Sequence, residues 1–307
     1  MRPDTAAIEI AFVNNMPDAA LSATLNQFSR LVRRGAAGKV FRLRCYTLPS
    51  IARGESARAF LDRTHESIEA LYARGADALI VSGAEPKAAH LSDEPYWSDL
   101  AQLVDWARIN TLSTLWSCLA SHAAVLHLDG IERRRRPSKL SGVFAFEAEP
   151  GDWVNDGCGA RVLSPHSRYN DLPQAELEAR GYIVASASET SGVNVFWRRE
   201  PSLFVFLQGH PEYDRDTLAR EYRRDMTRFL GGEMPERPAP PENYFAEEFE
   251  TQFRRALAAE PAAGRGVSVI PTGEQAPEMT WAADATRLYR NWIEATAREK
   301  RRWRISA

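Results

Sequence analysis

The segment TLSTLWSCLASHAAVLHL, Thr111–Leu128, changes character at Cys118. The residues before the cysteine are apolar and β-branched, which is typical of a buried strand, whereas the alanine-rich residues after it favour a helix. Short apolar runs alternate with helix-periodic segments along most of the chain. Such alternation predicts βαβ units, so we expect an α/β fold with a doubly wound, mostly parallel sheet and helices on both faces.

The expected elements can be placed along the sequence from their periodicity. The predicted strands are Ile8–Val13, Val40–Tyr46, Ala78–Val81, Thr111–Ser117, Tyr182–Ala185, Val193–Trp197 and Leu203–Leu207, the last two forming an antiparallel hairpin. The predicted helices are Leu21–Arg33, Ser56–Arg74, Tyr96–Ile109, Asp214–Leu230, Ala246–Ala259 and Ala283–Arg301. Residues 231–245 are rich in proline and glycine and predict a loop. We expect one domain over residues 1–307, with a core (1–234) and a C-terminal loop and helices (235–307) packed on it.

The overall composition excludes several classes of protein. A formal net charge of -2 gives no electrostatic basis for binding nucleic acid or a membrane. The cysteines at 45, 118 and 158 are too few and too scattered for a disulfide framework or a zinc site, so no metal is expected. An odd number of cysteines, the lack of a signal peptide and the lack of an apolar run of about 20 residues predict a cytoplasmic protein.

Five polar segments are expected to meet at one edge of the sheet. They are VNNMP (13–17), VSGAEPK (81–87), the junction at Cys118, SPHSRYND (164–171) and LQGHPEYD (207–214). In doubly wound sheets, ligands bind outside the carboxyl ends of the strands. These segments therefore predict a single active site.

Cys118 has a physical advantage as a nucleophile at this edge. A helix that begins just after it directs backbone N–H groups, starting with that of Leu119, and a positive dipole end toward the sulfur. This favours a reactive thiolate, and the same N–H groups can stabilise an oxyanion. Free cysteine is also among the residues most often buried. Considered alone, Cys118 could therefore be either a nucleophile or a structural residue.

The motif GHPE adds a candidate base. In an extended segment, His210 and Glu212 point the same way, because they are two residues apart. Glu212 can then hold the tautomer of His210 while His210 serves Cys118 as base. The alternative is a tight loop with a solvent-facing histidine. The other two cysteines have no such partner and are interpreted as structural, and His122 is interpreted as a packing residue or a support for the site.

Longer motifs along the chain resemble those of one family. They are NNMP, IVSGAEP, PYWSDLAQLVDWA, STLWSCLASHAA, SKLSGVFAFE, PHSRYND and GHPEYDRDTLAREYRRDM, within residues 8–241, and then ENYF and TWAADATRLYRNWIEA. In order and spacing they are similar to the homoserine O-acyltransferases usually called homoserine O-succinyltransferases. The resemblance implies the flavodoxin-like fold of class I glutamine amidotransferases. Amidotransferases themselves carry glycines around the nucleophile, as G-x-C-x-G, which WSCLASHA lacks.

The resemblance also implies roles for individual residues. The implied catalytic residues are Cys118 as acylated nucleophile, His210 as general base and Glu212 as its partner. The implied substrate-binding residues are Lys139, Ser167 and Arg224. An arginine fork suits an α-carboxylate, although Arg224 without the resemblance would be an ordinary exposed helix arginine.

The implied reaction has two steps. The Cys118 thiolate takes an acyl group from acyl-CoA, and the γ-hydroxyl of homoserine, deprotonated by His210, then takes it from the enzyme. Exchange between thioesters is nearly balanced in energy, and an enclosed site keeps water from the acyl-enzyme. The family further implies methionine biosynthesis, small-molecule substrates, acyl-CoA as a co-substrate, no permanently bound cofactor and a homodimer.

The position that is associated with acyl-donor specificity in the family has a residue that differs from the family pattern. After SGAEP the family has glutamate with acetyl donors and glycine with succinyl donors, whereas this chain has Lys87. A cation favours a donor with a free carboxylate, so we expect succinyl-CoA over acetyl-CoA. The lysines that often follow MP in the family are replaced by Asp18 and Ala19, and the N-terminal arm of longer members is not in this sequence.

Several alternatives stay open at this point. The same nucleophile could serve another acceptor such as serine, or the triad could belong to a glutaminase or amidase. A non-catalytic binding protein is disfavoured by the intact Cys118, His210 and Glu212 set. The basic run Arg133–Arg136 is either a solvated loop or a contact to the phosphates of CoA.

Overall fold

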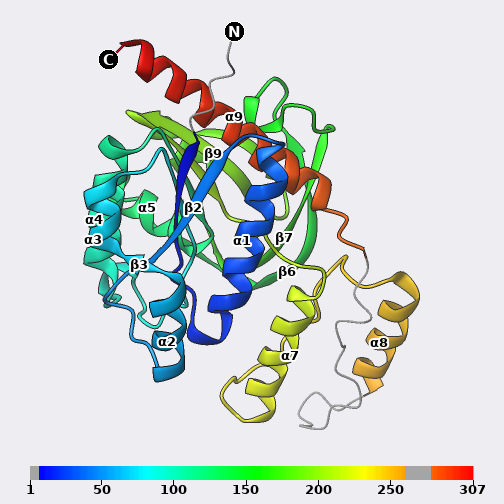
Figure 1. Ribbon diagram of the computed structural model, residues 1–307. Coiled ribbons are helices and arrows are strands. Elements are labelled where there is room, and N and C mark those ends of the chain that lie inside the picture. The colour runs from blue at the N-terminus through cyan, green and yellow to red at the C-terminus, as the bar shows by residue number, and fades with distance from the viewer. Residues whose placement is uncertain (1–6, 260–277, 307) are drawn as a thin grey trace.

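The computed structural model describes residues 7–259 and 278–306 of the chain. Their strands form one sheet in the order β3-β2-β1-β4-β5-β10-β9-β8-β6-β7 (Figure 1). The strands are β1 (Ile8–Val13), β2 (Phe41–Thr47), β3 (Glu66–Ser67), β4 (Ala78–Val81), β5 (Ser113–Ser117), β6 (Arg134–Ala148), β7 (Arg161–Asp171), β8 (Ile183–Ser188), β9 (Gly192–Glu200) and β10 (Ser202–Leu207). The helices are α1 (Leu21–Ala36), α2 (Glu55–Thr64), α3 (Ile68–Arg74), α4 (Trp97–Asn110), α5 (Leu119–Asp129), α6 (Gln174–Ala179), α7 (Thr217–Leu230), α8 (Glu247–Ala259) and α9 (Ala282–Ser306).

The sheet is parallel on one side and antiparallel on the other. Parallel pairs join β3, β2, β1, β4, β5 and β10. Antiparallel pairs join β10, β9, β8, β6 and β7. The mostly parallel α/β sheet and the β9–β10 hairpin are therefore confirmed. The parallel strands end at one edge, where their following loops meet.

Helices cover both faces of this sheet (Figure 1). On one face, Phe12 of β1 packs against Phe28 of α1 with ring centroids 4.8 Å apart, and Trp292 of α9 is buried in the same cluster. On the other face, α3, α4, α5 and α6 bury their apolar side chains in a second cluster. Burial of apolar side chains is the main stabilising contribution of these helices. The first turns of α5 are buried all round, since every residue from Leu119 to Val125 is buried.

The C-terminal helix packs closely against the first helix. A Cβ atom added at Gly35 of α1 would lie 2.7 Å from the Cβ of Tyr289 of α9 and 2.9 Å from its carbonyl carbon. The two backbones approach this closely only because Gly35 has no side chain. The predicted packing of the C-terminal helical segment on the main domain is thereby confirmed.

The segment Ser56–Arg74, predicted as one helix, is broken in the middle. It forms α2 and α3, separated by the short edge strand β3. His65 is extended, with φ -125° and ψ 152°, and the Ser67 hydroxyl accepts from the Ala70 backbone N–H at 3.4 Å to start α3. Periodicity missed this break because the apolar residues on both sides keep helical spacing, while pairing with β2 decides the extended conformation.

The long antiparallel ribbon β6–β7 was not predicted. It includes Arg134–Arg136 and the segment SPHSRYND, both of which were expected to be loops. A register shift between Arg135 and Leu140 leaves a bulge at residues 136–139. These strands are rich in charged and polar residues, so their pairing comes from the neighbouring strand rather than from a local apolar pattern.

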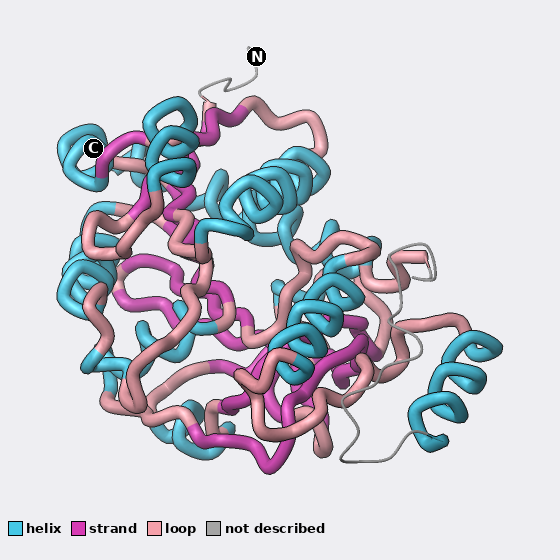
Figure 2. Tube along the Cα trace, turned by 90° about the horizontal axis from the view of Figure 1, so that it is seen from below, coloured by secondary structure: helices cyan, strands magenta, loops and turns pink. Residues whose placement is uncertain are grey.

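The remaining helices lie at the periphery of the molecule. The predicted loop at 231–245 is largely irregular, and α8 follows it at the edge of the body in two perpendicular views (Figures 1 and 2). Phe253 of α8 packs on Tyr222 and Met226 of α7. Among the described ranges, 7–259 and 278–306, no helix is both long enough and apolar enough to cross a membrane.

Candidate active site

Cys118 occupies a sharp turn between β5 and α5. Its backbone has φ 51° and ψ -114°, and its N–H donates to the Leu207 carbonyl at 2.7 Å. A non-glycine residue with such a φ stores about 1–3 kcal/mol of strain, and such residues cluster at active sites. The strained turn places the cysteine at the N-terminus of α5, as predicted.

His210 and Glu212 follow the strand next to that of the nucleophile. Leu207 of β10 pairs in parallel register with Ser117 of β5, so the segments after both strands leave the sheet side by side. Nδ1 of His210 lies 2.8 Å from Oε1 of Glu212, and both residues are buried. The carboxylate accepts this bond, which fixes the proton on Nδ1 and leaves Nε2 for proton exchange.

The electrostatics of His210 favour its charged form. Burial opposes the positive charge, but the neighbouring Cys118 and Glu212 outweigh burial and raise the pKa of His210 well above its ordinary value. The ring of Tyr213 stacks on the imidazole, with centroids 4.3 Å apart. These contacts bring together the three residues that the sequence predicts to be catalytic, in the order that a nucleophile, its base and an orienting carboxylate require.

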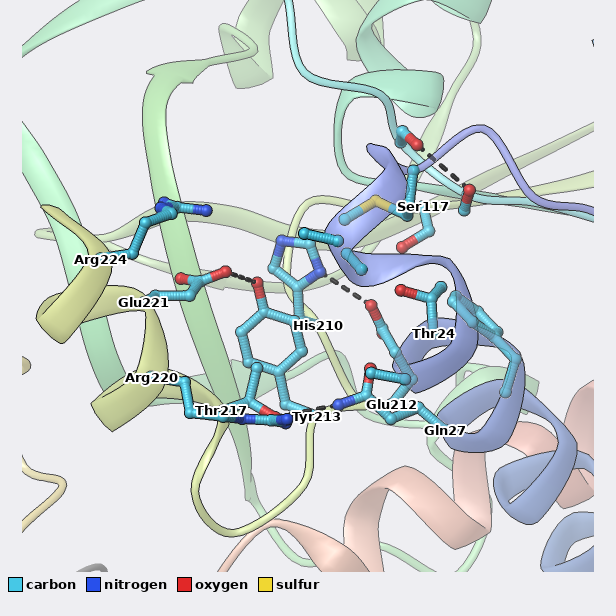
Figure 3. Close-up of a pocket in the computed structure, with 17 residues that line it drawn as sticks. Thr24, Gln27, Ser117, His210, Glu212, Tyr213, Thr217, Arg220, Glu221 and Arg224 are labelled. Carbon is cyan, nitrogen blue, oxygen red and sulfur yellow. Dashed lines mark hydrogen bonds and ion pairs between the residues drawn. The ribbon is translucent and has the colours of Figure 1, made fainter. Parts of the chain in front are cut away.

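A pocket of about 220 Å³ opens beside His210 (Figure 3). Its walls come from α1, the end of β4 and the first turns of α7. Arg224 and Glu221 line it from α7, and the hydroxyl of Tyr213 donates to Oε1 of Glu221 at 2.7 Å. The pocket therefore offers a cation and a carboxylate next to the candidate base, which suits a small zwitterion.

Lys139 and Arg224 are brought together by a residue that the sequence reasoning missed. Asp225, buried in α7, accepts from Nζ of Lys139 at 2.7 Å and from Nε of Arg224 at 2.9 Å. Burial acts to raise the pKa of Asp225, but the two cations outweigh it and lower that pKa below its usual value. The adjacent letters R and D in YRRDM were the only sequence signal for this bridge.

The other predicted substrate and specificity positions lie on separate loops and strands. Ser167 of β7 pairs with Ser141 of β6, on the same ribbon that carries Lys139. Lys87 lies on the loop after β4, and its side chain is exposed. Ser167 and Lys87 do not line the pocket beside His210.

The backbone of Leu119 faces the loop after β4. A Cβ atom added at Gly83 would lie 3.3 Å from the Leu119 nitrogen and 3.5 Å from the Ser117 carbonyl oxygen. The lack of a side chain at Gly83 leaves room in front of this N–H. The position suits the donor to an oxyanion that we expected of Leu119.

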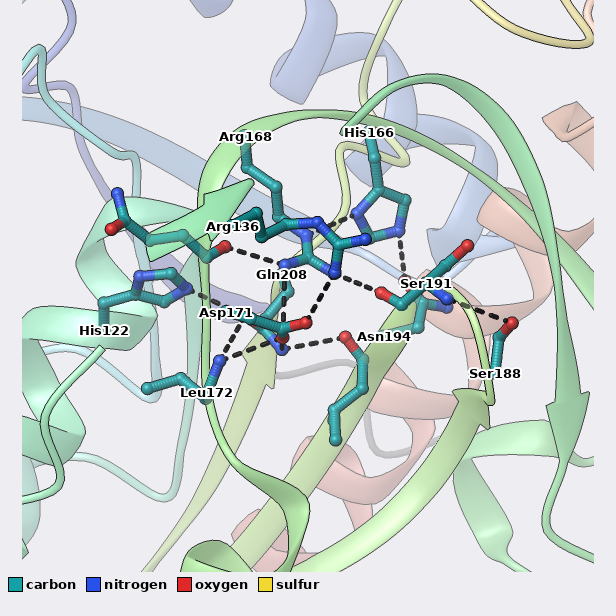
Figure 4. A network of polar contacts seen from close by, with 12 residues as sticks. His122, Arg136, His166, Arg168, Asp171, Leu172, Ser188, Ser191, Asn194 and Gln208 are labelled. Atoms are coloured by element: carbon teal, nitrogen blue, oxygen red, sulfur yellow. Dashed lines mark hydrogen bonds and ion pairs between the residues drawn. The ribbon is translucent and has the colours of Figure 1, made fainter. Parts of the chain in front are cut away.

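A buried polar network contains His122 and Gln208, which lie close in sequence to Cys118 and His210 (Figure 4). Nε2 of His122 lies 2.9 Å from Oε1 of Gln208, and the amide nitrogen of Gln208 donates to Asp171 at 3.1 Å. Burial lowers the pKa of His122 to about 3, so the ring is neutral and donates through Nε2. His122 lies one turn after Cys118 and Gln208 lies two residues before His210, so this bond links the nucleophile's helix to the base.

A second part of this network holds β7 against the base (Figure 4). Nδ1 of His166 accepts from Nε of Arg168 at 3.1 Å, and its Nε2 lies 3.2 Å from Oδ1 of Asn194. Burial, together with Arg168, lowers the pKa of His166 well below its ordinary value, so the ring stays neutral. The neighbouring carbonyl of Pro165 accepts from the His210 backbone N–H at 2.8 Å. β7 thus contributes directly to the position of the base.

Comparisons with known proteins identify the family of this chain. The homoserine O-succinyltransferase family model matches residues 1–301. The homoserine O-succinyltransferase of Rhodopseudomonas palustris is 47% identical over 306 residues, covering 97% of this chain and 92% of the relative. The chain belongs to the homoserine O-succinyltransferase family. The homoserine O-succinyltransferase of Methylorubrum extorquens is 49% identical over 296 residues, covering 95% of this chain and 88% of the relative. The predicted resemblance is confirmed, and the chain is an acyltransferase.

Solved structures confirm the amidotransferase-like fold of this homoserine O-succinyltransferase family member. A glutamine amidotransferase from Thermotoga maritima is 13% identical with a TM-score of 0.52, covering 95% of this chain and 98% of that chain. One from Methylobacillus flagellatus is 14% identical with a TM-score of 0.51, covering 94% of each chain. At such low identity the likeness supports the fold alone.

The basic run of this family member is largely engaged in other contacts. Arg134 forms an ion pair with Glu176, and NH1 of Arg136 lies 2.9 Å from Oδ2 of Asp171. Arg135 lies over an aromatic ring of β7, 5.2 Å from its centroid. The expectation of a loop is therefore wrong for 134–136, which form the start of β6, whereas the expected exposure to solvent holds for Arg134 and Arg135. The carboxylates that pair with Arg134 and Arg136 come from α6 and β7.

The described residues, 7–259 and 278–306, include all the cysteines of the chain, along with side chains of types that can bind a metal ion. The cysteines at 45, 118 and 158 are free. Burial and, to a lesser degree, Glu66 raise the pKa of Cys45 to about 11, and burial also raises the pKa of Cys158. Both are thus poor nucleophiles. Within the part of the chain that the structure describes, no group of three or more His, Cys, Asp or Glu side chains is placed to hold a metal ion.

Proposed function

We propose that this protein transfers a succinyl group from succinyl-CoA to the γ-hydroxyl of homoserine and forms O-succinyl-L-homoserine. The observation that carries the proposal is the position of Cys118, strained at the N-terminus of α5 beside the buried His210–Glu212 pair. The family name, the pocket beside the base and the absence of glycines next to Cys118 support this reaction over glutamine hydrolysis.

In the first step, the Cys118 thiolate attacks the thioester carbonyl of the acyl-CoA. The N–H of Leu119 faces the position where the oxyanion develops, and the charge moves from sulfur to oxygen. The tetrahedral intermediate collapses with cleavage of the bond to CoA. His210, protonated in the resting enzyme, gives its proton to the departing CoA thiolate and becomes neutral.

In the second step, neutral His210 takes the proton of the homoserine γ-hydroxyl. The resulting oxygen nucleophile attacks the acyl-Cys118 carbonyl, and collapse of the intermediate releases the ester and restores the thiolate. Glu212 stabilises the imidazolium and holds its tautomer in both steps. This sequence is a ping-pong mechanism, in which CoA leaves before the ester forms.

The cations of α7 and β6 are proposed to bind the amino acid. Arg224 lines the pocket with its guanidinium, and Asp225 holds it next to Lys139. The guanidinium fork matches the α-carboxylate of homoserine. Ser167, on the ribbon beside Lys139, is proposed as a further contact to this substrate.

Lys87 is proposed to influence the choice of acyl donor. It is an exposed cation on the loop next to the nucleophile, where it favours the negatively charged succinyl group over acetyl. A clear preference for acetyl-CoA in kcat/KM would contradict this part of the proposal. An acetyl donor or another hydroxy-amino acid acceptor would leave the mechanism unchanged.

Mass spectrometry after brief incubation with succinyl-CoA tests the proposal. We expect one succinyl adduct on the peptide that contains Cys118, its loss on addition of homoserine, and no adduct in Cys118→Ala. Ammonia release from glutamine, with no adduct from any acyl-CoA, would favour the glutaminase instead. Initial rates with both substrates varied should give the parallel lines of a ping-pong mechanism.

The wider setting is also a proposal. O-Succinylhomoserine formation places the protein in methionine biosynthesis, in the cytoplasm, and we propose a homodimer and a single domain over residues 1–307. Sedimentation velocity measures the oligomeric state. Coincident urea unfolding curves from tryptophan fluorescence and far-UV circular dichroism would support one cooperative domain.

A further inference from the structure

Arg133 lies beside the helix that starts at the nucleophile. It follows Ile131, whose N–H donates to the Val125 carbonyl in the middle of α5 at 3.4 Å. It precedes Arg134, which pairs with Asp171 at the start of the β6–β7 ribbon. Asp171 belongs to the polar network that contains Gln208 and His122 (Figure 4). These neighbours place Arg133 between α5 and the edge of the site.

The charge of Arg133 has no ion-pair partner among the described residues. Its side chain is half-buried, and no described carboxylate or carbonyl within hydrogen-bond distance engages the guanidinium. Burial lowers its pKa, whereas four neighbours, Tyr96, Glu94, Cys118 and Glu132 in decreasing order, raise it. A partly desolvated guanidinium near the nucleophile, without a salt bridge, is a strong site for an anion.

Two buried polar atoms beside Arg133 also lack hydrogen-bond partners within the described ranges. They are the Tyr96 hydroxyl and Oε2 of Glu94, whose residues are only 6% and 4% exposed. Burial raises the pKa of Tyr96, so the hydroxyl keeps its proton and is a buried donor without an acceptor. An unmatched buried donor is costly, and a ligand oxygen at this place would complete its hydrogen bond.

Glu94 also connects this cluster to the loop after β4. Its Oε1 accepts from the backbone N–H groups of Lys87 and Ala88 at 2.6 and 2.7 Å. The loop that carries the expected acyl-specificity position is therefore fixed by a residue of the cluster. The Lys87 side chain is exposed, whereas Arg133 is half-buried and Tyr96 is buried.

We propose that Arg133 and Tyr96 form the receptor for the terminal carboxylate of the acyl group carried on Cys118, with Glu94 as a positioning residue. The guanidinium supplies the charge and the phenol supplies one hydrogen bond. An acetyl group has no atom to fill this receptor, so the receptor selects a dicarboxylic acyl donor. This inference rests on the proposed acyl transfer and names the residues that determine which acyl donor the site accepts.

Donor comparison tests the receptor directly. We would measure kcat/KM for succinyl-CoA and for butyryl-CoA, which has the same number of acyl carbons but no carboxylate, in wild type, Arg133→Gln and Tyr96→Phe. We expect Arg133→Gln to lower kcat/KM about 10- to 100-fold for succinyl-CoA, with little change for butyryl-CoA. Tyr96→Phe should do the same to a smaller degree. Arg42→Gln, which removes an exposed arginine paired with Glu9 on β1, is the matched control and should change neither value.

Each outcome decides the proposal. A selective loss for succinyl-CoA in both variants supports the receptor, and partial retention of that selectivity in Arg133→Lys supports the role of charge. An equal loss for both donors would instead indicate contact with the CoA moiety and overturns the receptor, as does no change in either. If wild type acylates Cys118 from no acyl-CoA, the proposed function itself fails, which is a separate result from an unchanged donor ratio in an active enzyme.

Discussion

Substitution of Gly209 by alanine tests whether the packing around His210 holds the candidate base in position. It lies between the end of β10 and His210, with no space beside it. An added Cβ would overlap Oγ of Ser164 and would lie 2.7 Å from Nε2 of His166 and 2.9 Å from Oδ1 of Asn194. Gly209→Ala must therefore push β7 and β9 away from the base.

The expected magnitude follows from what has to move. His166 and Asn194 are both buried and lie 3.2 Å apart, so relief of the overlap separates them. Overpacking a core costs about 1–3 kcal/mol, and a lost buried hydrogen bond adds about 1 kcal/mol. We expect the free energy of unfolding to fall by about 2–4 kcal/mol. Because His210 follows directly, kcat should also fall, by about tenfold for each 1.4 kcal/mol of lost alignment.

Urea unfolding and steady-state kinetics measure these two effects. Gly159→Ala is the matched control, since its nearest neighbour is the Arg161 carbonyl oxygen at 3.7 Å, an ordinary contact. The control should stay within about 0.5 kcal/mol of wild type with unchanged kcat. A Gly209→Ala protein with the stability and kcat of wild type would refute the account of the network as a support for the base.

Three other substitutions address the charge, the substrate pocket and the packing. The pKa of His210 is raised in the folded protein, so its protonation stabilises the fold below about pH 6.5, and this stabilisation is lost as the pH rises through the raised value. Glu212→Gln should reduce this loss of stability with rising pH, measured by urea unfolding, and should lower kcat at least about tenfold. An unchanged pH dependence of stability would contradict the pairing of His210 with Glu212. Asp225→Asn leaves its two cations unbalanced, and should cost about 3 kcal/mol of stability and raise the KM for homoserine but not for acyl-CoA; equal changes in both KM values would argue against the assigned pocket. Gly35→Ala gains about 1 kcal/mol of helix propensity, but the backbone contact with α9 should make it destabilising by about 1–3 kcal/mol, and a stabilised variant would contradict the close packing.

The parallel half of the sheet could be predicted because its strands carry their own signal. Buried parallel strands are continuous apolar runs, and β1, β4, β5 and β10 all lie within the predicted segments or differ by one or two residues at their ends. The junction at Cys118 was visible for the same reason, since an apolar run stops where an alanine-rich helix begins. The antiparallel ribbon β6–β7 had no such pattern.

Within the site, it was easier to predict which residues take part than to predict which side chains lie next to each other. Cys118, His210 and Glu212 could be chosen from chemistry and motif, because β5 and β10 carry them to the same edge. Asp225 and the Arg133–Tyr96 cluster could not be found in this way. Their roles depend on which charges face each other across different elements, and sequence spacing contains no information on that.

The sequence by itself determined the α/β class and the family, and it predicted the candidate catalytic residues, since these depend on local periodicity and on motifs that are contiguous in the chain. Only the tertiary structure decided how the four arginines of the basic run differ. Folding places Glu176 of α6 beside Arg134 and Asp171 of β7 beside Arg136, whereas Arg133 remains beside α5 without an ion-pair partner among the described residues. The electrostatic role of a charge depends on its burial and on its neighbours in space, so four identical letters in a row acquire different roles only when the chain is folded.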